Sequence, residues 1–224
     1  MDELWVAKAG LLSYEDGIAL QERLRARRQA GEIRDTLLLL EHPPVYTKGR
    51  RTGAGDLPMG EDWYRSQGIA VEDTDRGGKV TYHGPGQLVG YPIMAVTDVL
   101  AYVRGTERAM IAALADEGIE ARCREGLTGI WVGERKIGSI GVHVSRGVTT
   151  HGFAVNVDND LQPFEWIVPC GIEGVRMTSI CREKGAGENL DCFRKRAAWR
   201  FAKEFGLRQR LVSLERMTGL PVAA

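Results

Sequence analysis

Twelve of the chain's 28 glycines lie in two segments whose residue patterns are otherwise typical of β-strands. They are Gly77, Gly78, Gly84, Gly86 and Gly90 in residues 76–90, and Gly126, Gly129, Gly133, Gly138, Gly141, Gly147 and Gly152 in residues 126–152. Glycine weakens a strand because it has no side chain to pack and loses more backbone entropy on folding. Repeated glycines there indicate either bulges and tight hairpin turns or a main chain that lies close to a ligand.

The patterns around these segments predict one α+β domain over residues 1–224. Apolar residues at helical spacing predict helices over 14–30 and 97–117, a third helix over 189–205 and a short fourth over 209–217. Strands are expected over 4–8, 36–40, 68–72, 79–83, 87–93, 135–144 and 148–157, the last two as a hairpin around 145–147, with a loop over 50–60. Strands in the middle of the chain, with helices before, between and after them, favour a mixed or antiparallel sheet.

Charge and composition argue against several classes of protein. Thirty basic and thirty acidic side chains cancel, which argues against a nucleic-acid or membrane binder but leaves room for a local basic patch. Residues 1–10 carry acids at Asp2 and Glu3 and no long apolar run, so no secretory signal is expected. The longest aliphatic run, 37–40, is far too short to span a membrane. We therefore expect a cytoplasmic protein.

One of the cysteines stands in an unusual context. The four are Cys123, Cys170, Cys181 and Cys192. With no export signal, they are expected to be reduced thiols, and no Cys-x-x-Cys pair or histidine spacing predicts a metal site. A single cysteine is by default a small buried hydrophobe. Cys170, however, lies between the rigid Pro169 and the permissive Gly171 in an irregular segment, which makes it a candidate nucleophile.

The two glycine segments carry further candidate residues. Residues 76–87 read Arg-Gly-Gly-Lys-Val-Thr-Tyr-His-Gly-Pro-Gly-Gln, which is neither a Walker A loop nor a dinucleotide fingerprint. A turn that leads into a strand ending at His83 would suit an acyl chain or a carbonyl better than a phosphate. In the second segment, Lys136 opens a strand among apolar and glycine residues. It is either a solvated strand end or a desolvated lysine that takes part in chemistry.

Taken together, these elements resemble the lipoyl(octanoyl) transferases, the octanoyl-[acyl-carrier-protein]:protein octanoyltransferases of lipoate biosynthesis. The resemblance covers roughly residues 36–182. It rests on Glu41-His42-Pro43-Pro44-Val45-Tyr46-Thr47-x-Gly49-Arg50, on Arg76-Gly77-Gly78 through Thr81-Tyr82-His83 with Gly86-Gln87 and Tyr91, on Gly129-Ile130-Trp131, on Lys136 to Val142, on His151 to Val157, and on Pro169-Cys170-Gly171. The family is similar in fold to lipoate- and biotin-protein ligases. The resemblance therefore implies one catalytic α+β domain of that type, with a mixed β-sheet flanked by helices.

The resemblance also implies a mechanism and a set of site residues. Cys170 would carry the acyl group and Lys136 would be its partner. The octanoyl group would come from acyl-carrier protein and pass to a lysine of lipoyl domains in 2-oxoacid dehydrogenase complexes or of the glycine cleavage H protein, with no ATP, metal or cofactor. The implied substrate-binding residues are Arg76, Gly77, Gly78, Lys79, Val80, Thr81, Tyr82, His83, Ser139, Ile140, Gly141, Gly152, Phe153 and Ala154.

Two roles and three alternative functions stay open at this point. His83 is either an orienting residue or a hydrogen-bonded core histidine, and Arg50 and Arg51 are candidates for a basic patch that contacts an acidic carrier protein. An ATP-dependent ligase would share the fold, a non-catalytic relative would only bind acylated partners, and a cysteine thioesterase would release free octanoate. The form of the glycine loop and the lone candidate nucleophile favour the transferase over the ligases.

Overall fold

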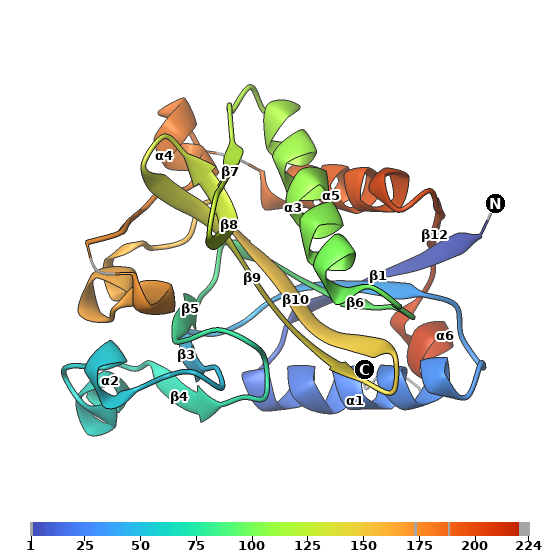
Figure 1. Ribbon diagram of the computed structural model, residues 1–224, viewed down its shortest axis with the longest axis horizontal. Coiled ribbons are helices and arrows are strands. Elements are labelled where there is room, and N and C mark those ends of the chain that lie inside the picture. Colours follow the sequence, from blue (N-terminus) through green and yellow to red (C-terminus); the bar gives the residue numbers. More distant parts are fainter. Residues whose placement is uncertain (1, 173, 188, 220–224) are drawn as a thin grey trace.

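A nine-stranded mixed sheet and a separate three-stranded sheet organise the part of the chain that the computed structural model describes, residues 2–172, 174–187 and 189–219 (Figure 1). The strands of the large sheet are β1 (Glu3–Leu11), β2 (Thr36–Glu41), β6 (Gln87–Ile93), β7 (Arg122–Arg124), β8 (Leu127–Val132), β9 (Arg135–Ser145), β10 (Val148–Asn156), β11 (Arg176–Met177) and β12 (Arg208–Leu211). Their order is β12-β1-β2-β6-β10-β9-β8-β7, with β11 beside β9. The strands pair in parallel at β12-β1-β2 and at β9-β11, and antiparallel elsewhere.

Helices cover both faces of the large sheet (Figure 1). Helix α1 (Tyr14–Gln29) packs on one face, and α3 (Val99–Ala115) and α5 (Leu190–Glu204) pack together on the other. The shorter helices are α2 (Glu61–Ser66), α4 (Ile180–Lys184) and α6 (Leu214–Thr218). The predicted α+β architecture, with a mixed sheet flanked by helices, is confirmed.

Strand β2 shows why the sheet needs helices on both sides. Its side chains point alternately to opposite faces, as the period of a strand requires. Leu37 and Leu39 enter the core under α3 and α5, whereas Leu38 and Leu40 enter the core under α1. All four are buried, so a continuous apolar run here marks a strand covered on both faces.

The small sheet holds a third core beside the large one. It has the order β4-β3-β5 and consists of β3 (Val45–Lys48), β4 (Ala70–Asp73) and β5 (Thr81–His83). Aromatic residues Tyr46, Tyr64, Tyr82 and Phe164 fill its core. Three short 3-10 turns also occur, at Ala54–Asp56, Gln162–Trp166 and Pro169–Gly171. The last of these packs on β5 and therefore ties Cys170 to the small sheet.

The long elements match the prediction within a few residues, and the hairpin of β9 and β10 is confirmed with Ser145 opposite Val148. Its two turn residues, Arg146 and Gly147, both have positive φ, as a two-residue hairpin of this type requires. Several short elements were not expected: strand β3, helix α2, the hairpin of β7 and β8, strand β11 and helix α4. The β7 sequence, Arg-Cys-Arg, lacks the apolar alternation by which strands are recognised.

The expectation of a helix over 209–217 is wrong. That segment forms β12 and then the short helix α6, which begins after the N-cap Ser213. Strand β12 lies at the edge of the large sheet, where Arg208 and Arg210 of β12 both bind Glu3 of β1. Cross-strand ion pairs, rather than an apolar face, define this strand, and they depend on a partner more than 200 residues away.

Close approach between β6 and β10 explains two of the clustered glycines. Gly90 lies opposite Phe153, and a side-chain Cβ at Gly90 would come within 2.2 Å of the Phe153 ring. A Cβ at Gly152 would come within 2.3 Å of the Gly90 carbonyl oxygen. These glycines therefore let an aromatic ring and neighbouring main chain pack where larger residues would clash.

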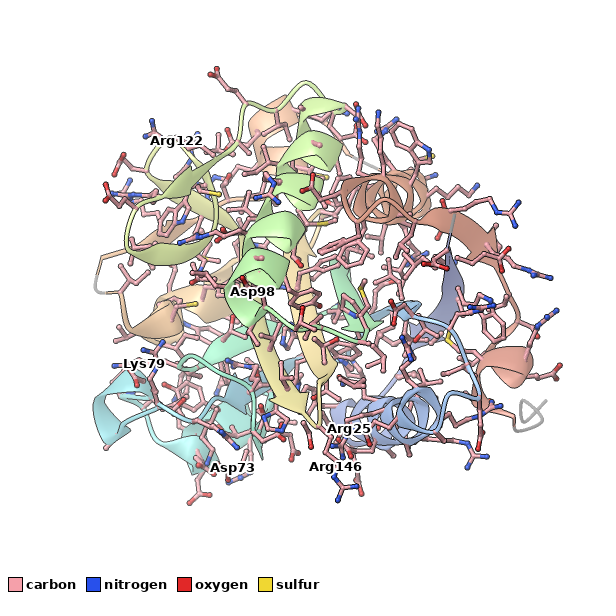
Figure 2. The ribbon with its side chains drawn as sticks, turned by 45° about the vertical axis from the view of Figure 1, so that its right-hand side comes forward. Arg25, Asp73, Lys79, Asp98, Arg122 and Arg146 are labelled. Atoms are coloured by element: carbon pink, nitrogen blue, oxygen red, sulfur yellow. The ribbon has the colours of Figure 1, made fainter. Side chains whose placement is uncertain are left out.

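Charged side chains cover the outside of the molecule (Figure 2). The labelled Asp98 at the start of α3, Arg122 of β7 and Lys79 before β5 come from three separate parts of the chain. None of the helices in the described ranges is both long enough and apolar enough to cross a membrane.

We predict that Phe201→Ala lowers the free energy of unfolding by about 3–5 kcal/mol, because Phe201 is fully buried in the core between α5 and the sheet. Urea denaturation followed by circular dichroism measures this change. Trp199→Ala on the same helix is the control. Trp199 is 48% exposed and stacks on Arg200 and Lys203, so its loss should cost at most about 1 kcal/mol. Equal losses from the two variants would contradict the assignment of this core.

Candidate active site

The Pro169–Gly171 turn holds Cys170 in a conformation that non-glycine residues rarely adopt. Cys170 has a φ of 57° and a ψ of 13°, in the left-handed region that costs such a residue about 1–3 kcal/mol. Two main-chain hydrogen bonds fix the turn: the Cys170 N–H donates to the Val80 carbonyl over 2.9 Å, and the Val168 N–H donates to the Asp56 carbonyl over 3.0 Å. The main chain on both sides therefore sets the direction of the thiol.

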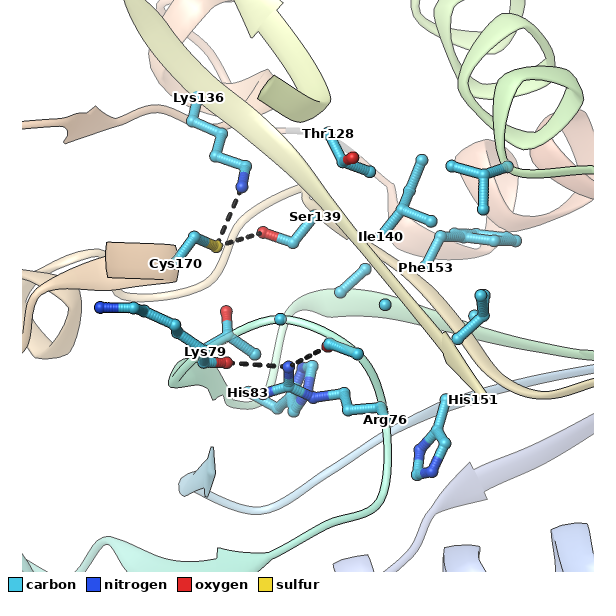
Figure 3. Close-up of a pocket in the computed structure, with 18 of the residues that line it drawn as sticks. Arg76, Lys79, His83, Thr128, Lys136, Ser139, Ile140, His151, Phe153 and Cys170 are labelled. Atoms are coloured by element: carbon cyan, nitrogen blue, oxygen red, sulfur yellow. Dashed lines mark hydrogen bonds between the residues drawn. The ribbon is translucent and has the colours of Figure 1, made fainter. Parts of the chain in front are cut away.

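Lys136, near the start of β9, points at this thiol (Figure 3). Its Nζ lies 3.0 Å from Cys170 Sγ, and the residue is only 1% exposed. The ammonium also lies 5.7 Å from the centre of the Trp131 ring, within the range of a cation–π interaction. Of the two environments that the sequence left open for Lys136, the structure shows the desolvated one. It also brings together two residues that lie 34 positions apart.

Three neighbours stabilise the negative charge of a Cys170 thiolate. Exclusion of water from the sulfur raises the pKa of the thiol, but the Lys136 ammonium, the Arg76 guanidinium and the Ser139 hydroxyl outweigh this effect and hold the pKa below its ordinary value. The Ser139 Oγ lies 3.9 Å from Sγ. Because the thiolate is the reactive form of cysteine, the arrangement can support nucleophilic catalysis.

A cavity of about 320 Å³ opens beside the thiol, a size in the range of small-molecule sites. Cys170 and Lys136 form one side of it, and Ile140 and Phe153 lie toward α3 on the other (Figure 3). The residues predicted for the site that line the cavity are Arg76, Gly77, Gly78, Lys79, Thr81, His83, Lys136, Ser139, Ile140, Gly141, Gly152, Phe153, Ala154 and Cys170. A slot with a nucleophile at one end and apolar walls beyond it can accept an apolar acyl chain.

Val80 and Tyr82, also predicted for the site, lie outside the cavity lining. Both side chains pack in the core of the small sheet. Lys79, Thr81 and His83 line the cavity, and alternate side chains of an extended segment point to opposite sides. Val80 contributes only its carbonyl, which accepts the Cys170 N–H.

Comparison with known proteins now assigns the family. Residues 13–202 match the lipoyl protein ligase A/B catalytic domain. A protein from Solibacter usitatus named octanoyltransferase is 47% identical over 219 residues, which cover 96% of each chain. The chain belongs to the octanoyltransferases. It is therefore an enzyme of the acyltransferase class.

Solved structures show that this octanoyltransferase shares the ligase fold. A lipoate-protein ligase A bound with ATP superposes with a TM-score of 0.71 at 17% identity, over 97% of this chain and 92% of that chain. A biotin protein ligase from Aquifex aeolicus superposes with a TM-score of 0.52 at 13% identity, over 92% of this chain and 70% of that chain. The predicted lipoate/biotin ligase type of fold is thus confirmed.

Several residues of the octanoyltransferase cavity were not singled out from the sequence. Leu127 and Thr128 come from β8, whose hairpin was not expected, and Val103 comes from α3, where its helical spacing indicates only a core position. The Glu-Gly pair at residues 125–126 is the one local signal for the missed hairpin. Of the two arginines expected in a basic patch, Arg51 lines the cavity and Arg50 does not.

Positively charged side chains line the cavity around the nucleophile, and Lys79 among them pairs with Asp56 behind the lining. The charged residues that line the cavity, among those the structure describes, are Arg51, Arg76, Lys79 and Lys136. Arg76 is buried, and its guanidinium donates to neutral acceptors, which include the Thr47 carbonyl and hydroxyl. Its positive charge is therefore not cancelled locally and acts on the Cys170 sulfur. A chain with zero net charge thus concentrates positive potential at one site.

His83 contributes to the cavity as a neutral ring. Burial first, and then the nearby His42, lower the pKa of His83 to about 3. Its Nδ1 lies 2.7 Å from Gln87 Oε1, and the Gln87 Nε2 donates to the Tyr82 carbonyl and to Asn156 Oδ1. These contacts make the Gln87 oxygen an acceptor, so His83 Nδ1 carries the proton and the unprotonated Nε2 can accept a hydrogen bond. Within the described residues, no three His, Cys, Asp or Glu side chains gather as metal ligands.

We predict that Lys136→Ala raises the pKa of the Cys170 thiol and lowers kcat/KM for octanoyl transfer by about 10²–10⁴-fold, because it removes the closest positive charge and a candidate proton-transfer group. The rate of iodoacetamide alkylation at Cys170, followed by peptide mass spectrometry from pH 5 to 10, measures the thiol pKa. Lys184→Ala, which removes a partly exposed cation that binds Glu117 beyond the end of α3, is the control. An unchanged alkylation profile in Lys136→Ala would remove Lys136 from this role.

Proposed function

We propose that this octanoyltransferase carries the octanoyl group on Cys170 as a thioester between its donor and its acceptor. The observation that carries the proposal is the 3.0 Å contact between the buried Lys136 ammonium and the Cys170 sulfur, at the end of an apolar cavity. A free thiol at neutral pH is mostly protonated, and this contact favours the thiolate. The family relationship supplies the acyl group that the cavity would hold.

In the first half of the reaction, Cys170 Sγ attacks the carbonyl carbon of an octanoyl thioester, for which we propose octanoyl-acyl-carrier protein. The new S–C bond forms as the bond to the donor sulfur breaks, and the departing thiolate takes a proton from the Lys136 ammonium. This step exchanges one thioester for another, so it needs no ATP. It leaves Lys136 neutral beside an acylated Cys170.

In the second half, a lysine amine of the acceptor attacks the acyl-enzyme. The amine nitrogen forms the new amide bond and gives up a proton to neutral Lys136, while the C–S bond to Cys170 breaks. The thiolate and the ammonium are then restored side by side. The amide is more stable than the thioester, which drives the transfer forward. We propose lipoyl domains of 2-oxoacid dehydrogenase complexes and the glycine cleavage H protein as acceptors.

The main chain near Arg76 offers donors for the acyl carbonyl. Gly78 and Lys79 line the cavity, and within the described residues their N–H groups donate to no acceptor. The Cys170 and Gly171 N–H groups are already used by the Val80 and Val168 carbonyls. We therefore propose the glycine loop, rather than the cysteine turn, as the source of hydrogen bonds to the oxyanion of the transition state.

Incubation with octanoyl-acyl-carrier protein alone should add the mass of one octanoyl group to the wild-type enzyme, measured on the intact protein. Cys170→Ser should not form this adduct. A hydroxyl is much less acidic than a thiol, so it would stay protonated beside Lys136 and would be a weak nucleophile. Cys181→Ser, in which a partly buried thiol is changed elsewhere, should keep the adduct. An adduct that depends on Cys181 would overturn the assignment, and rapid release of free octanoate without acceptor would indicate a thioesterase.

Transfer to a lipoyl domain should proceed at the same rate with and without ATP, because each step exchanges an already activated acyl group. The measurement is the mass gain of a purified lipoyl domain, with its acceptor lysine changed to alanine as the control. Octanoyl transfer that occurs only with free octanoate and ATP would show a ligase instead, the activity class of the ATP-bound structural relative.

A further inference from the structure

Glu107 is a buried carboxylate that the chemistry above does not use. It lies on α3, and its side chain is 0% exposed. Its Oε1 accepts the Gly129 N–H over 2.9 Å, and its Oε2 accepts from Arg104 Nη1 over 2.6 Å and lies 3.5 Å from Cys123 Sγ. A carboxylate is costly to bury unless its oxygens are paired. The contacts of Glu107 meet that condition, and they direct one of its oxygens to the main chain of β8.

The glycine that Glu107 holds supports the side chain of Lys136. Gly129 lies on β8 directly before the point where the pairing of β8 with β9 shifts register, between Ile130 and Trp131. Its φ of 133° is a value that few residues other than glycine adopt. A Cβ at this position would come within 2.6 Å of Lys136 Cε and 3.2 Å of Lys136 Nζ. The stem of Lys136 therefore lies directly against the Gly129 main chain.

We infer that Glu107 is a positioning residue for Lys136. Its carboxylate holds the Gly129 N–H at the irregular part of β8, and Gly129 in turn forms the surface on which the Lys136 stem rests with its ammonium 3.0 Å from Cys170 Sγ. Arg104 donates a charge-assisted hydrogen bond to the second carboxylate oxygen, so both oxygens of Glu107 have partners in the core. This inference assigns Glu107 to the thioester mechanism proposed above and therefore rests on it.

The Cys170 thiol pKa is the first readout, because it needs no acyl transfer and reports the distance of the Lys136 ammonium. Glu107→Ala leaves the Gly129 N–H without its acceptor and lets the support of Lys136 shift. We expect it to raise the pKa of the Cys170 thiol and to lower kcat by up to about a hundredfold, the effect of misplacing a catalytic group by about 1 Å. Glu107→Gln keeps an acceptor oxygen for Gly129 and should retain a thiol pKa close to that of the wild type.

Glu117→Ala is the matched control for the loss of a buried acid. The Glu117 side chain, just beyond the end of α3, is 6% exposed and pairs with Lys184 and Arg196. Its removal should lower thermal stability without changing the alkylation profile of Cys170. A profile that shifts equally in Glu107→Ala and Glu117→Ala would show a general loss of stability and overturn the inference.

A double-mutant cycle separates positioning from other effects of Glu107. In a Lys136→Met background, which keeps the length of the stem but has no ammonium, Glu107→Ala should leave the Cys170 alkylation profile unchanged. A further shift in that background would show that Glu107 acts on the thiol by another route and would overturn the inference. Failure of the wild-type enzyme to form an acyl adduct would instead refute the thioester mechanism, while the alkylation profiles would still report whether Glu107 positions Lys136.

Discussion

The contact between the Lys136 ammonium and the Cys170 sulfur is the interaction on which the rest of this structure depends. Neither group is stable as an isolated charge in a buried place. Lys136 is the second residue of β9 in the large sheet, and Cys170 comes from a turn tied to the small sheet. The large sheet and the small sheet must therefore keep a fixed position relative to each other. The hydrogen bond from the Cys170 N–H to the Val80 carbonyl fixes the cysteine turn, and the bond from the Gly77 N–H to the Val142 carbonyl fixes the glycine loop on β9.

Folding and the ionisation of Cys170 are coupled through this contact. Its thiol pKa is lowered in the folded protein, so the folded state gains stability at pH values above the thiol pKa of the unfolded chain. That gain is lost as the pH falls through the lowered pKa of the folded state. The left-handed backbone of Cys170 acts in the opposite direction, since it costs about 1–3 kcal/mol at any pH. The ion pair thus offsets part of the strain that aims the sulfur.

Sequence patterns predicted the features that depend on neighbouring residues, and missed those that depend on distant ones. The continuous apolar run from Leu37 to Leu40 and the turn at Arg146-Gly147 are local signals, and both elements formed as expected. Strand β12 is held by ion pairs to Glu3, and β7 carries arginines instead of an apolar face, so neither has a local pattern to read. These strands were missed for that reason.

The residues of the candidate site divide in the same way, into those with a local sequence signal and those that depend on distant partners. The motif resemblance pointed to Cys170 and Lys136, but only the fold could show that they touch. The prediction counted Val80 and Tyr82 as substrate-binding because it took every residue of the contiguous motif. An extended segment, however, presents only every second side chain to the cavity, and these two pack in the core of the small sheet. Glu107 carries no signal in the sequence, because a lone glutamate on a helix looks like a solvated residue until its partner on β8 is known.

The proposed cycle requires Lys136 to give up a proton in one half-reaction and to take one back in the other, and the charge on its sulfur neighbour changes between the two. Before acylation, the thiolate offers the ammonium a negative partner 3.0 Å away. Acylation removes that negative charge, while Arg76 remains buried nearby without a carboxylate partner. The acyl-enzyme thus holds two buried basic side chains, Lys136 and Arg76, beside a neutral sulfur. No carboxylate of the described cavity lining takes the place of the thiolate, so in the proposed cycle only the attack of the acceptor amine, which releases the thiolate again, restores the negative partner of Lys136.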